Sequence, residues 1–244
     1  MTWHVIAGAA GCAHAATHGC AALVVDALRA SATAAMLCEH GARAILVTRG
    51  VDEARALAAA RPGALLYGER EGLPPEGFHH GNSPAEAVHA RDRDVIFTTT
   101  TGAQRLADVA AAPAAAMATT VNARAAVAWA QAQGRDVTVI PAGLASDPDF
   151  NAQEDWAAAA WLVECSGAPV GEGREAAAHW RRRIAEEGLP RLFETAPHAE
   201  NLRRLGLADD LVFCARTDVT SAVPAVTGME AGAARLACWR PPRP

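Results

Sequence analysis

The chain has 244 residues, of which 51% are apolar and 20% are charged, and this composition excludes a disordered chain, a collagen and a coiled coil. The formal charge of −5 and the lack of a run of basic residues argue against nucleic acid or an anionic membrane as a partner. All 22 basic residues are Arg, which excludes a Schiff-base lysine and a Walker-type phosphate-binding lysine.

The cysteines indicate a reducing environment. The six cysteines are scattered, with no C-x-x-C pair and no cysteine–histidine cluster at zinc spacing, which predicts free thiols. Residues 1–19 lack the basic and apolar regions of a secretory leader, and no apolar run reaches the length of a membrane span. We therefore expect a cytoplasmic protein.

Short runs rich in Val, Ile and Leu alternate with Ala-rich helical stretches in the first part of the chain. The pattern predicts strands at 21–26, 44–48, 65–68, 94–98, 115–118 and 137–140. It predicts helices at 31–40, 51–60, 102–110 and 122–133. Strands that alternate with helices need crossover connections, so we expect a single three-layer α/β/α domain over residues 1–244, with a largely parallel or mixed central sheet.

The pattern changes beyond residue 150, where helices dominate. Helices are predicted at 153–165, 175–187 and 199–205, and a last strand at 219–226. Trp156 and Trp161 on the first of these helices are interpreted as core packing. A subunit contact, and with it a homodimer, is the alternative interpretation.

Ligands of parallel sheets bind beyond the carboxyl ends of the strands, so the residues at those ends are the first candidates for a site. The strand 21–26 ends at Asp26, and Arg29, Ser31 and Thr33 follow at the start of a helix. The free amides and the dipole of a helix N-terminus suit an anion. The alternative is that Asp26 or Ser31 only caps the helix and that Arg29 is solvated.

The strand 65–68 is followed by Glu69, by Arg70 and by a long loop that contains Asn82 and Ser83. Loops of this length are uncommon unless they have a function. Glu69 is suited to ligating a hard cation, and Arg70 to holding a phosphate or carboxylate through paired hydrogen bonds. A surface salt bridge on a Gly/Pro turn is the alternative for these two residues.

Two further strand ends carry polar residues. The strand 94–98 leads into Thr99, Thr100 and the Gly102 turn, whose hydroxyls and amides can face the same anion as Arg29, although strand propensity alone also explains threonines. The strand 137–140 leads through an Ala-Gly turn to Asp155 in the first turn of a helix. Acids at that place are usual partners of the helix dipole, and metal binding is the alternative for Asp155.

These ends place carboxylates, arginines, hydroxyls and glycine turns on strands that we expect to be neighbours. A phosphate ester needs the same groups: a hard divalent ion on carboxylates, Arg on the non-bridging oxygens, and amides directed at the charge. The sequence therefore predicts binding or cleavage of a small-molecule phosphate ester.

At these residues the chain resembles the 2-phosphosulfolactate phosphatase family. The stretch 24–33, V-V-D-A-L-R-A-S-A-T, is similar to that family's V-D-V-L-R-A-T-S-T. Residues 68–72 and 77–86 are similar to its G-E-R-x-G and G-F-D-x-G-N-S-P-x-E, and residues 98–102 to its T-T-T-N-G. An A-G turn and a C-terminal signature at 213–224 extend the resemblance over most of the chain.

The resemblance implies an Mg²⁺-dependent phosphatase of 2-hydroxycarboxylic acid phosphates, most directly of 2-phosphosulfolactate in coenzyme M biosynthesis. Asp26, Glu69 and Asp155 are the candidate ligands of Mg²⁺. Asp26, Arg29 and Arg70 are the candidate catalytic residues, with Asp26 either a metal ligand or a nucleophile. The residues expected to bind the substrate are Ser31, Thr33, Asn82, Ser83, Thr99, Thr100 and Gly102.

Three positions depart from the family pattern. His79 replaces an Asp, Thr101 replaces an Asn, and Ser221 stands where a second C-terminal Asp is common. The first change removes one candidate metal ligand or proton carrier, and the second removes an amide donor. The alternative function is therefore a non-catalytic anion-binding homologue. A nicotinamide oxidoreductase is disfavoured because no G-x-G-x-x-G follows the first strands.

Overall fold

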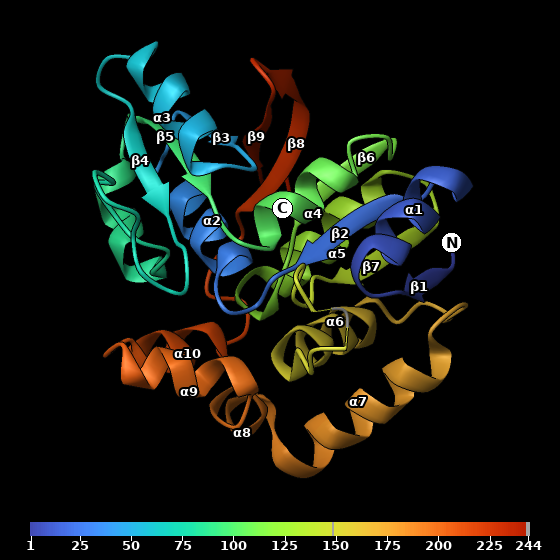
Figure 1. Cartoon of the computed structure of the whole chain (residues 1–244). Helices are drawn as coiled ribbons and strands as arrows, with labels where there is room; N and C mark the ends of the chain where they lie inside the picture. The colour runs from blue at the N-terminus through green and yellow to red at the C-terminus, as the bar shows by residue number, and fades with distance from the viewer. Residues whose placement is uncertain (148, 243–244) are drawn as a thin grey trace.

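The structure is a computed structural model, and it describes residues 1–147 and 149–242. Within these residues a nine-stranded mixed sheet carries helices on both faces (Figure 1), which confirms the expected three-layer α/β/α architecture. The strands are β1 (Trp3–Val5), β2 (Ala21–Val25), β3 (Ala44–Val47), β4 (Leu65–Gly68), β5 (Asp94–Thr98), β6 (Ala114–Met117), β7 (Val137–Pro141), β8 (Val223–Glu230) and β9 (Ala233–Trp239). The helices are α1 (Gly8–His18), α2 (Ala30–Glu39), α3 (Val51–Ala59), α4 (Gly102–Asp108), α5 (Ala123–Ala132), α6 (Gln153–Ser166), α7 (Arg174–Glu187), α8 (Leu189–Glu194), α9 (Pro197–Arg204) and α10 (Ala208–Cys214), with a 3₁₀ helix, η1, at Pro84–Ala90.

The sheet consists of two parallel blocks joined by an antiparallel hairpin. The strand order is β1-β7-β2-β6-β8-β9-β3-β5-β4. β1, β7, β2 and β6 run parallel to one another, and so do β3, β5 and β4. The hairpin β8–β9 pairs antiparallel with β6 on one side and with β3 on the other. A mixed sheet results, because the hairpin returns from the end of the chain to fill the space between the blocks.

The core forms on both faces of the sheet because successive side chains of a strand point to opposite faces. In β2 all five residues are buried; Leu23 and Val25 join a cluster with α5 and α6, whereas Val24 joins a cluster with α1, α2 and α4. On the other block Ile96 packs with α3. Strands buried on both faces read as continuous apolar runs, which is why these strands were predictable.

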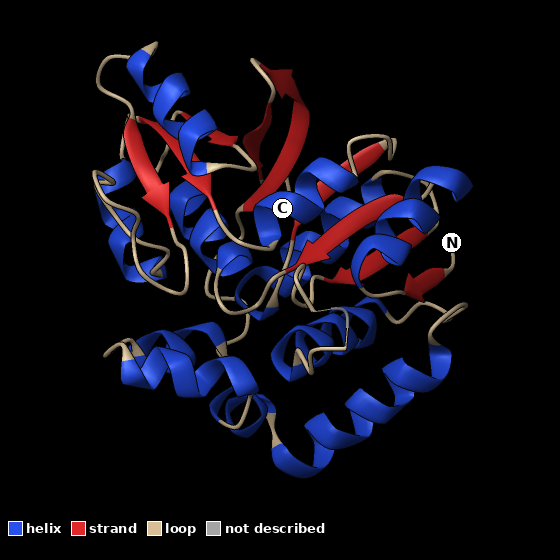
Figure 2. Cartoon of the chain, viewed as in Figure 1, coloured by secondary structure: helices blue, strands red, loops and turns tan. Residues whose placement is uncertain are grey.

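The helices α6 to α10 follow one another and gather along one side of the molecule (Figure 2). α6 packs against α5, α7 and α8, and α10 packs against α8 and α9. Trp156 and Trp161 of α6 are partly buried and contact the larger core cluster, as core packing requires. This helical layer matters for the site because α9 and α10 lie beside the loops that follow β2 and β4.

The structure differs from the sequence predictions at both ends of the chain. β1 and α1 were not predicted, because Ala, Gly and His in α1 give no apolar periodicity. The predicted last strand, 219–226, is shifted: β8 begins at Val223, since the amide of Thr220 donates to Val121 O instead of to a strand. β9 was also missed, although Gly232 (φ 83°) makes the tight turn that returns the chain.

Two expectations about the chain can be compared with the structure. All six cysteines are free thiols, as predicted. Among residues 1–147 and 149–242, no helix is both long enough and apolar enough to cross a membrane.

Candidate active site

The strand ends that carry the candidate residues belong to two pairs of neighbouring strands. β2 neighbours β7 and β4 neighbours β5, as expected, but β6, β8, β9 and β3 lie between β2 and β5, so the two pairs are not neighbours of each other. The ends meet because the chain crosses from one block to the other after β5: α4 packs on α1 and β2. In Figure 1 the arrowheads of β2, β4 and β5 point towards the same central region.

A cleft of about 670 Å³ lies where these ends meet. Residues of the loops after β2, β4, β5 and β7 form one side, and α9 forms the other. The polar and aromatic side chains that line it are Asp26, Arg29, Glu69, Arg70, Glu71, Asn82, Thr100, Thr101, Ser146, Phe150, His198, Asn201 and Arg204.

Asp26 lies at the base of the cleft, directly after β2. Its Oδ1 accepts from Ala30 N at 3.3 Å, its own amide donates to Ser31 Oγ at 3.0 Å, and Ser31 Oγ donates to Val24 O at 3.1 Å. These bonds close the turn from β2 into α2 and leave Oδ2 free of hydrogen bonds to the described residues. Burial and the negative charge of Glu69 raise the pKa of Asp26 to about 6.

Glu69 holds together two of the loops that build the cleft. Its Oε2 accepts from Gly72 N at 2.9 Å and its Oε1 accepts from Thr100 N at 2.8 Å. Each carboxylate oxygen keeps a second lone pair for a ligand. The carboxylates of Asp26 and Glu69 line the same cleft, where the charge of Glu69 makes the charged form of Asp26 less favourable.

Arg29 is 3% exposed and belongs to a buried ion pair. Its guanidinium donates to Asp210 Oδ2 on α10 at 2.7 Å and to Gly72 O at 2.8 Å. Ser83 Oγ donates to the other carboxylate oxygen of Asp210 at 2.7 Å. These two bonds to protein oxygens use two of the five N–H groups of Arg29, which also lines the cleft.

Arg70 and Arg204 add two more guanidinium groups to the cleft. Arg70 donates to Glu69 O at 2.6 Å, to Thr98 Oγ1 at 3.0 Å and to Arg49 O at 3.2 Å, so the side chain is held along the end of β5. Arg204 donates to Asn201 Oδ1 at 2.7 Å on the same helix, α9.

His198 on α9 is paired with the buried carboxylate of Glu154 on α6. The Nδ1 of His198 makes a short hydrogen bond to Glu154 Oε1, and Glu154 is 0% exposed. Burial by itself lowers the pKa of His198, but the bond to Glu154 and the charges of Asp26 and Glu69 outweigh it and raise the pKa. The raised pKa favours the protonated form of His198.

The predicted substrate-binding residues divide into two groups. Thr100 and Asn82 line the cleft, and the Oδ1 of Asn82 is buried with no partner among the described residues. The others build the walls. Thr33 Oγ1 donates to Asn82 O at 2.9 Å, and Thr99 Oγ1 accepts from Ala103 N at 3.0 Å, capping α4. Ser31 Oγ bonds within the turn that carries Asp26, and Ser83 Oγ donates to Asp210.

Gly102 begins α4 in contact with Asp26. A Cβ at position 102 would lie 2.8 Å from Asp26 Oδ2 and 2.8 Å from the Cβ of Ala30, which is attached directly to the backbone of α2. The glycine thus permits the close approach of α4 to the carboxylate.

We expect Gly102→Ala to lower kcat/KM for the expected phosphate-ester hydrolysis about tenfold, because the Asp26 carboxylate must move. The substitution should also lower the free energy of unfolding by about 1–3 kcal/mol. Steady-state kinetics and urea unfolding measure both quantities. Gly50→Ala is the matched control, since a Cβ there meets Glu53 only at 3.7 Å. If Gly102→Ala and Gly50→Ala changed kcat/KM and the free energy of unfolding equally, the contact of Gly102 with Asp26 would have no importance.

Asp155 lies outside the cleft-lining residues and is 2% exposed. Its Oδ1 accepts from Ala27 N at 2.7 Å and its Oδ2 accepts from Gly143 N at 3.0 Å. It therefore ties the loop that carries Asp26 to the turn after β7. Burial and the charges of Glu154 and Asp26 raise the pKa of Asp155.

The positions that depart from the family pattern occupy three different places. His79 is exposed, and its Nδ1 accepts from Leu66 N at 3.0 Å along the edge strand β4, away from the cleft. Thr101 does line the cleft, and its Oγ1 accepts from Ala145 N at 3.3 Å. Ser221 is exposed and contacts Arg240. Of the three, only Thr101 bears on the site.

The sequence did not predict the contributions of α9 and α10. His198, Asn201 and Arg204 on α9 and Asp210 on α10 enter the site from a part of the chain that contains no strand end. Pro197 and Asp209–Asp210 mark helix starts, but this signal is common to most helices and says nothing of what they face.

Comparison with known proteins gives a consistent result. The family model described as 2-phosphosulpholactate phosphatase matches residues 10–228. A protein of Gloeobacter violaceus named probable 2-phosphosulfolactate phosphatase is 34% identical over 210 residues, covering 84% of this chain and 88% of its own. Proteins of the same name from Deinococcus radiodurans (34% identity; 88% and 92% coverage) and Synechococcus sp. (36%; 84% and 88%) are also similar.

Proposed function

This chain belongs to the 2-phosphosulfolactate phosphatase family, and on that premise we propose that it hydrolyses phosphate monoesters of 2-hydroxycarboxylic acids in the cleft between β2, β4 and α9. The first candidate substrate is 2-phosphosulfolactate, which is cleaved to sulfolactate and phosphate. The observation that carries the proposal is that two carboxylates, Asp26 and Glu69, and the guanidinium groups of Arg29 and Arg70 line one cleft.

The charges of the cleft suit a polyanion. 2-Phosphosulfolactate carries a phosphate, a carboxylate and a sulfonate, and the cleft offers the guanidinium groups of Arg29, Arg70 and Arg204. Guanidinium groups bind such oxyanions through paired hydrogen bonds. We assign Arg29 and Arg70 to the phosphate and carboxylate end, since other residues hold both side chains in place, and Arg204 to the distal anionic group.

The carboxylates fit a divalent cation of the Mg²⁺ type. Asp26 and Glu69 offer hard oxygen ligands, and the raised pKa of Asp26 reflects an uncompensated negative charge that a cation would neutralise. Asp155 would keep Asp26 in place through the amide of Ala27. When bound, Mg²⁺ would neutralise charge on the phosphoryl oxygens. Mg²⁺ is proposed here as the cofactor.

Different residues of the chain would then carry out the steps of hydrolysis. Arg29 and Arg70 orient the phosphate and stabilise the charge that develops on its oxygens. Asp26 either ligates the cation, in which case water attacks phosphorus directly, or attacks phosphorus itself through Oδ2 to form an aspartyl phosphate that water then hydrolyses. In both cases the bond between phosphorus and the alcohol oxygen of the substrate breaks as the bond to the nucleophile forms. The leaving alkoxide takes a proton from protonated His198, and the attacking water supplies the proton that restores His198.

His198→Gln tests this proton transfer. We expect kcat to fall about a hundredfold with 2-phospholactate, whose alkoxide is a poor leaving group, and far less with 4-nitrophenyl phosphate, whose leaving group needs no proton. The fall of kcat at high pH in the wild type, caused by deprotonation of His198 above its raised pKa, should disappear in the variant. Stopped assays of phosphate release between pH 6 and 10 give both results.

His179→Gln is the matched control for this variant, because His179 is exposed on α7 outside the cleft. It should keep the wild-type pH profile. An equal loss with both leaving groups in His198→Gln would assign His198 to substrate binding instead of proton transfer.

The function itself is tested by phosphate release from 2-phosphosulfolactate, 2-phospholactate and phosphoglycolate, with Mg²⁺ and after EDTA treatment. We expect turnover that depends on Mg²⁺, with the highest kcat/KM for 2-phosphosulfolactate. A rise of Tm with these compounds but no phosphate release would instead select the non-catalytic anion-binding homologue. Turnover unaffected by EDTA would contradict the cation assignment alone.

A further inference from the structure

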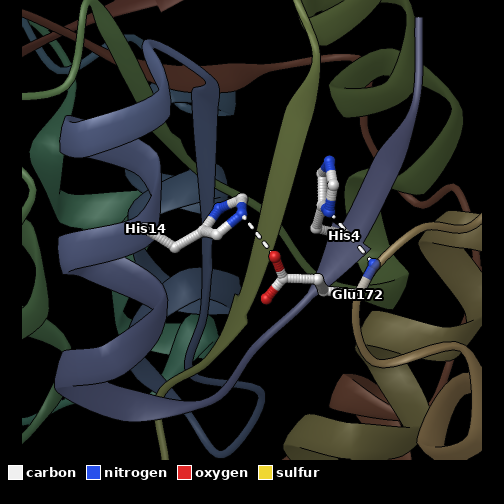
Figure 3. Close-up of side chains that lie close together, drawn as sticks. All are labelled: His4, His14 and Glu172. Carbon is white, nitrogen blue, oxygen red and sulfur yellow. Dashed lines mark hydrogen bonds and ion pairs between the residues drawn. The ribbon is translucent and has the colours of Figure 1, made fainter.

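A second cluster of chemically active side chains lies at the edge of the sheet, apart from the cleft. It consists of His4 on the edge strand β1, His14 on α1 and Glu172 in the loop before α7 (Figure 3). One ligand atom from each residue lies within 4.8 Å of the other two, and none of the three residues lines the cleft. Three separate segments thus bring nitrogen and oxygen ligands to one point that the proposed reaction does not use.

His14 is prepared to act as a ligand. It is 8% exposed, its Nδ1 lies 2.9 Å from Oγ1 of the buried Thr138 on β7, and its Nε2 faces Glu172 Oε1 at 3.6 Å. With the proton on Nδ1, donated to Thr138, the Nε2 lone pair points at Glu172, which is the arrangement of metal-binding histidines. Burial, with help from His4 and His18, lowers the pKa of His14 and favours the neutral ring that a metal requires.

His4 and Glu172 are held next to each other by the backbone. The amide of Glu172 donates to His4 Nδ1 at 3.1 Å, and a Cβ on Gly171 would lie 2.7 Å from Cε1 of the ring. The glycine therefore lets the loop lie directly on the imidazole. A cation that takes the Nδ1 lone pair replaces this one hydrogen bond.

An ion pair alone does not account for the cluster. Glu172 is 64% exposed, and an ion pair with such an exposed carboxylate contributes little stability. His4 also adds a second imidazole, which an ion pair with Glu172 does not require.

We propose that His4, His14 and Glu172 bind one transition-metal ion, with Zn²⁺ as the reference ion, and that this ion fastens the loop before α7 to β1 and α1. Two imidazoles and a carboxylate, completed by water, favour Zn²⁺ over Mg²⁺. Ligand atoms around tetrahedral zinc are roughly 3.3 Å apart, so the cluster contracts by up to about 1.5 Å on binding. The exposed side chain of Glu172 is free to make that movement.

The test is titration of the metal-free full chain with Zn²⁺ by calorimetry and with Co²⁺ by visible absorption. The variants are Glu172→Gln and His4→Gln, and the matched control is Glu175→Gln, an exposed acid on the adjacent helix. We expect one saturable Zn²⁺ site per wild-type chain, a higher Tm with Zn²⁺ but not with Mg²⁺, and an affinity lowered more than about tenfold in both variants. The control should bind as the wild type does.

The free cysteines are the competing ligands, so the Co²⁺ spectrum is decisive. Visible d–d bands without thiolate charge-transfer absorption support the site, whereas thiolate bands or equal affinity in wild type and variants overturn it. The absence of saturable binding overturns it as well. Tm in EDTA verifies that the variants fold. Phosphate release with Mg²⁺ should be unchanged in Glu172→Gln, which separates this proposal from the proposed function.

Discussion

Replacing Asp26 by Asn is expected to abolish turnover and yet to stabilise the protein. Above pH 7 the carboxylate of Asp26 is charged in spite of its burial and the nearby charge of Glu69, and its raised pKa reflects what this costs the folded state. The amide keeps the shape of the side chain and removes its charge. We expect kcat/KM to fall at least about a thousandfold, or ~4 kcal/mol, since either a ligand of the cation or the nucleophile is lost.

The stability gain depends on pH in a predictable direction. Folding raises the pKa of Asp26 from 3.8 to about 6, so the folded protein binds this proton more tightly than the unfolded chain does. Protonation of Asp26 therefore stabilises the folded state at low pH, and this stabilisation is lost as pH rises from about 4 to about 6. Without Mg²⁺, Asp26→Asn should raise the free energy of unfolding by about 1–2 kcal/mol above pH 6 and by nothing below pH 4, allowing for the partial exposure of Asp26.

Urea unfolding in EDTA at several pH values, with kcat/KM measured in parallel, checks both expectations. Asp52→Asn is the control, because Asp52 is 98% exposed on α3 and should change stability by less than about 0.5 kcal/mol. If Asp26→Asn lost stability together with activity, Asp26 would be a structural residue of the turn after β2. Chemical trapping of an aspartyl phosphate in the wild type then decides between nucleophile and metal ligand.

The sequence predicts most of the local structure because the parallel strands are buried on both faces. The run from Leu23 to Val25 contains no polar residue, so the strand is easily recognised. The polar residues from Asp26 onwards mark its end. Secondary structure from β2 to β7 agrees with the prediction to within one or two residues at most boundaries. Such signals are local, and so a single sequence contains them.

The long-range order of the sheet is not encoded in the same way. Nothing near β2 or β5 indicates that a hairpin more than a hundred residues further on inserts between their blocks. The site could still be anticipated, because the crossover through α4 brings Thr100 and Gly102 to Asp26 whatever lies between the strands. Asp26, Glu69 and Thr100 line one cleft, but the strands β2 and β5 that lead to Asp26 and Thr100 are not neighbours in the sheet.

Residues whose importance comes from burial were the hardest to find. Asp210 and Glu154 look like ordinary acids of a helix N-terminal turn, and only packing shows that one is paired with Arg29 and the other with His198. A buried charge needs a partner, but sequence alone does not say which acids are buried. His79 is the opposite case. Its place in a family motif suggested a position in the site, but its hydrogen bond with Leu66 N places it beside the edge strand β4.

Arg29 and Arg70 are expected to affect activity alike and stability differently. Arg29→Ala and Arg70→Ala should each lower kcat/KM by about two orders of magnitude, because each removes a guanidinium from the proposed phosphate site. Arg29→Ala should also cost about 3 kcal/mol of stability, since it leaves the Asp210 carboxylate, 7% exposed, without its counter-ion. Arg70 bonds to neutral oxygens only, so its loss should cost about 1 kcal/mol.

A double variant separates the two effects of Arg29. In Arg29→Ala/Asp210→Asn the stranded charge is gone, and Asn keeps an oxygen for Ser83, so most of the lost stability should return while kcat/KM stays low. Arg55→Ala, an exposed arginine paired with an exposed acid, should change neither quantity. Recovery of activity together with stability would mean that Arg29 serves only to hold α10. If stability returns without activity, the guanidinium of Arg29 is needed for the reaction itself, apart from its ion pair with Asp210.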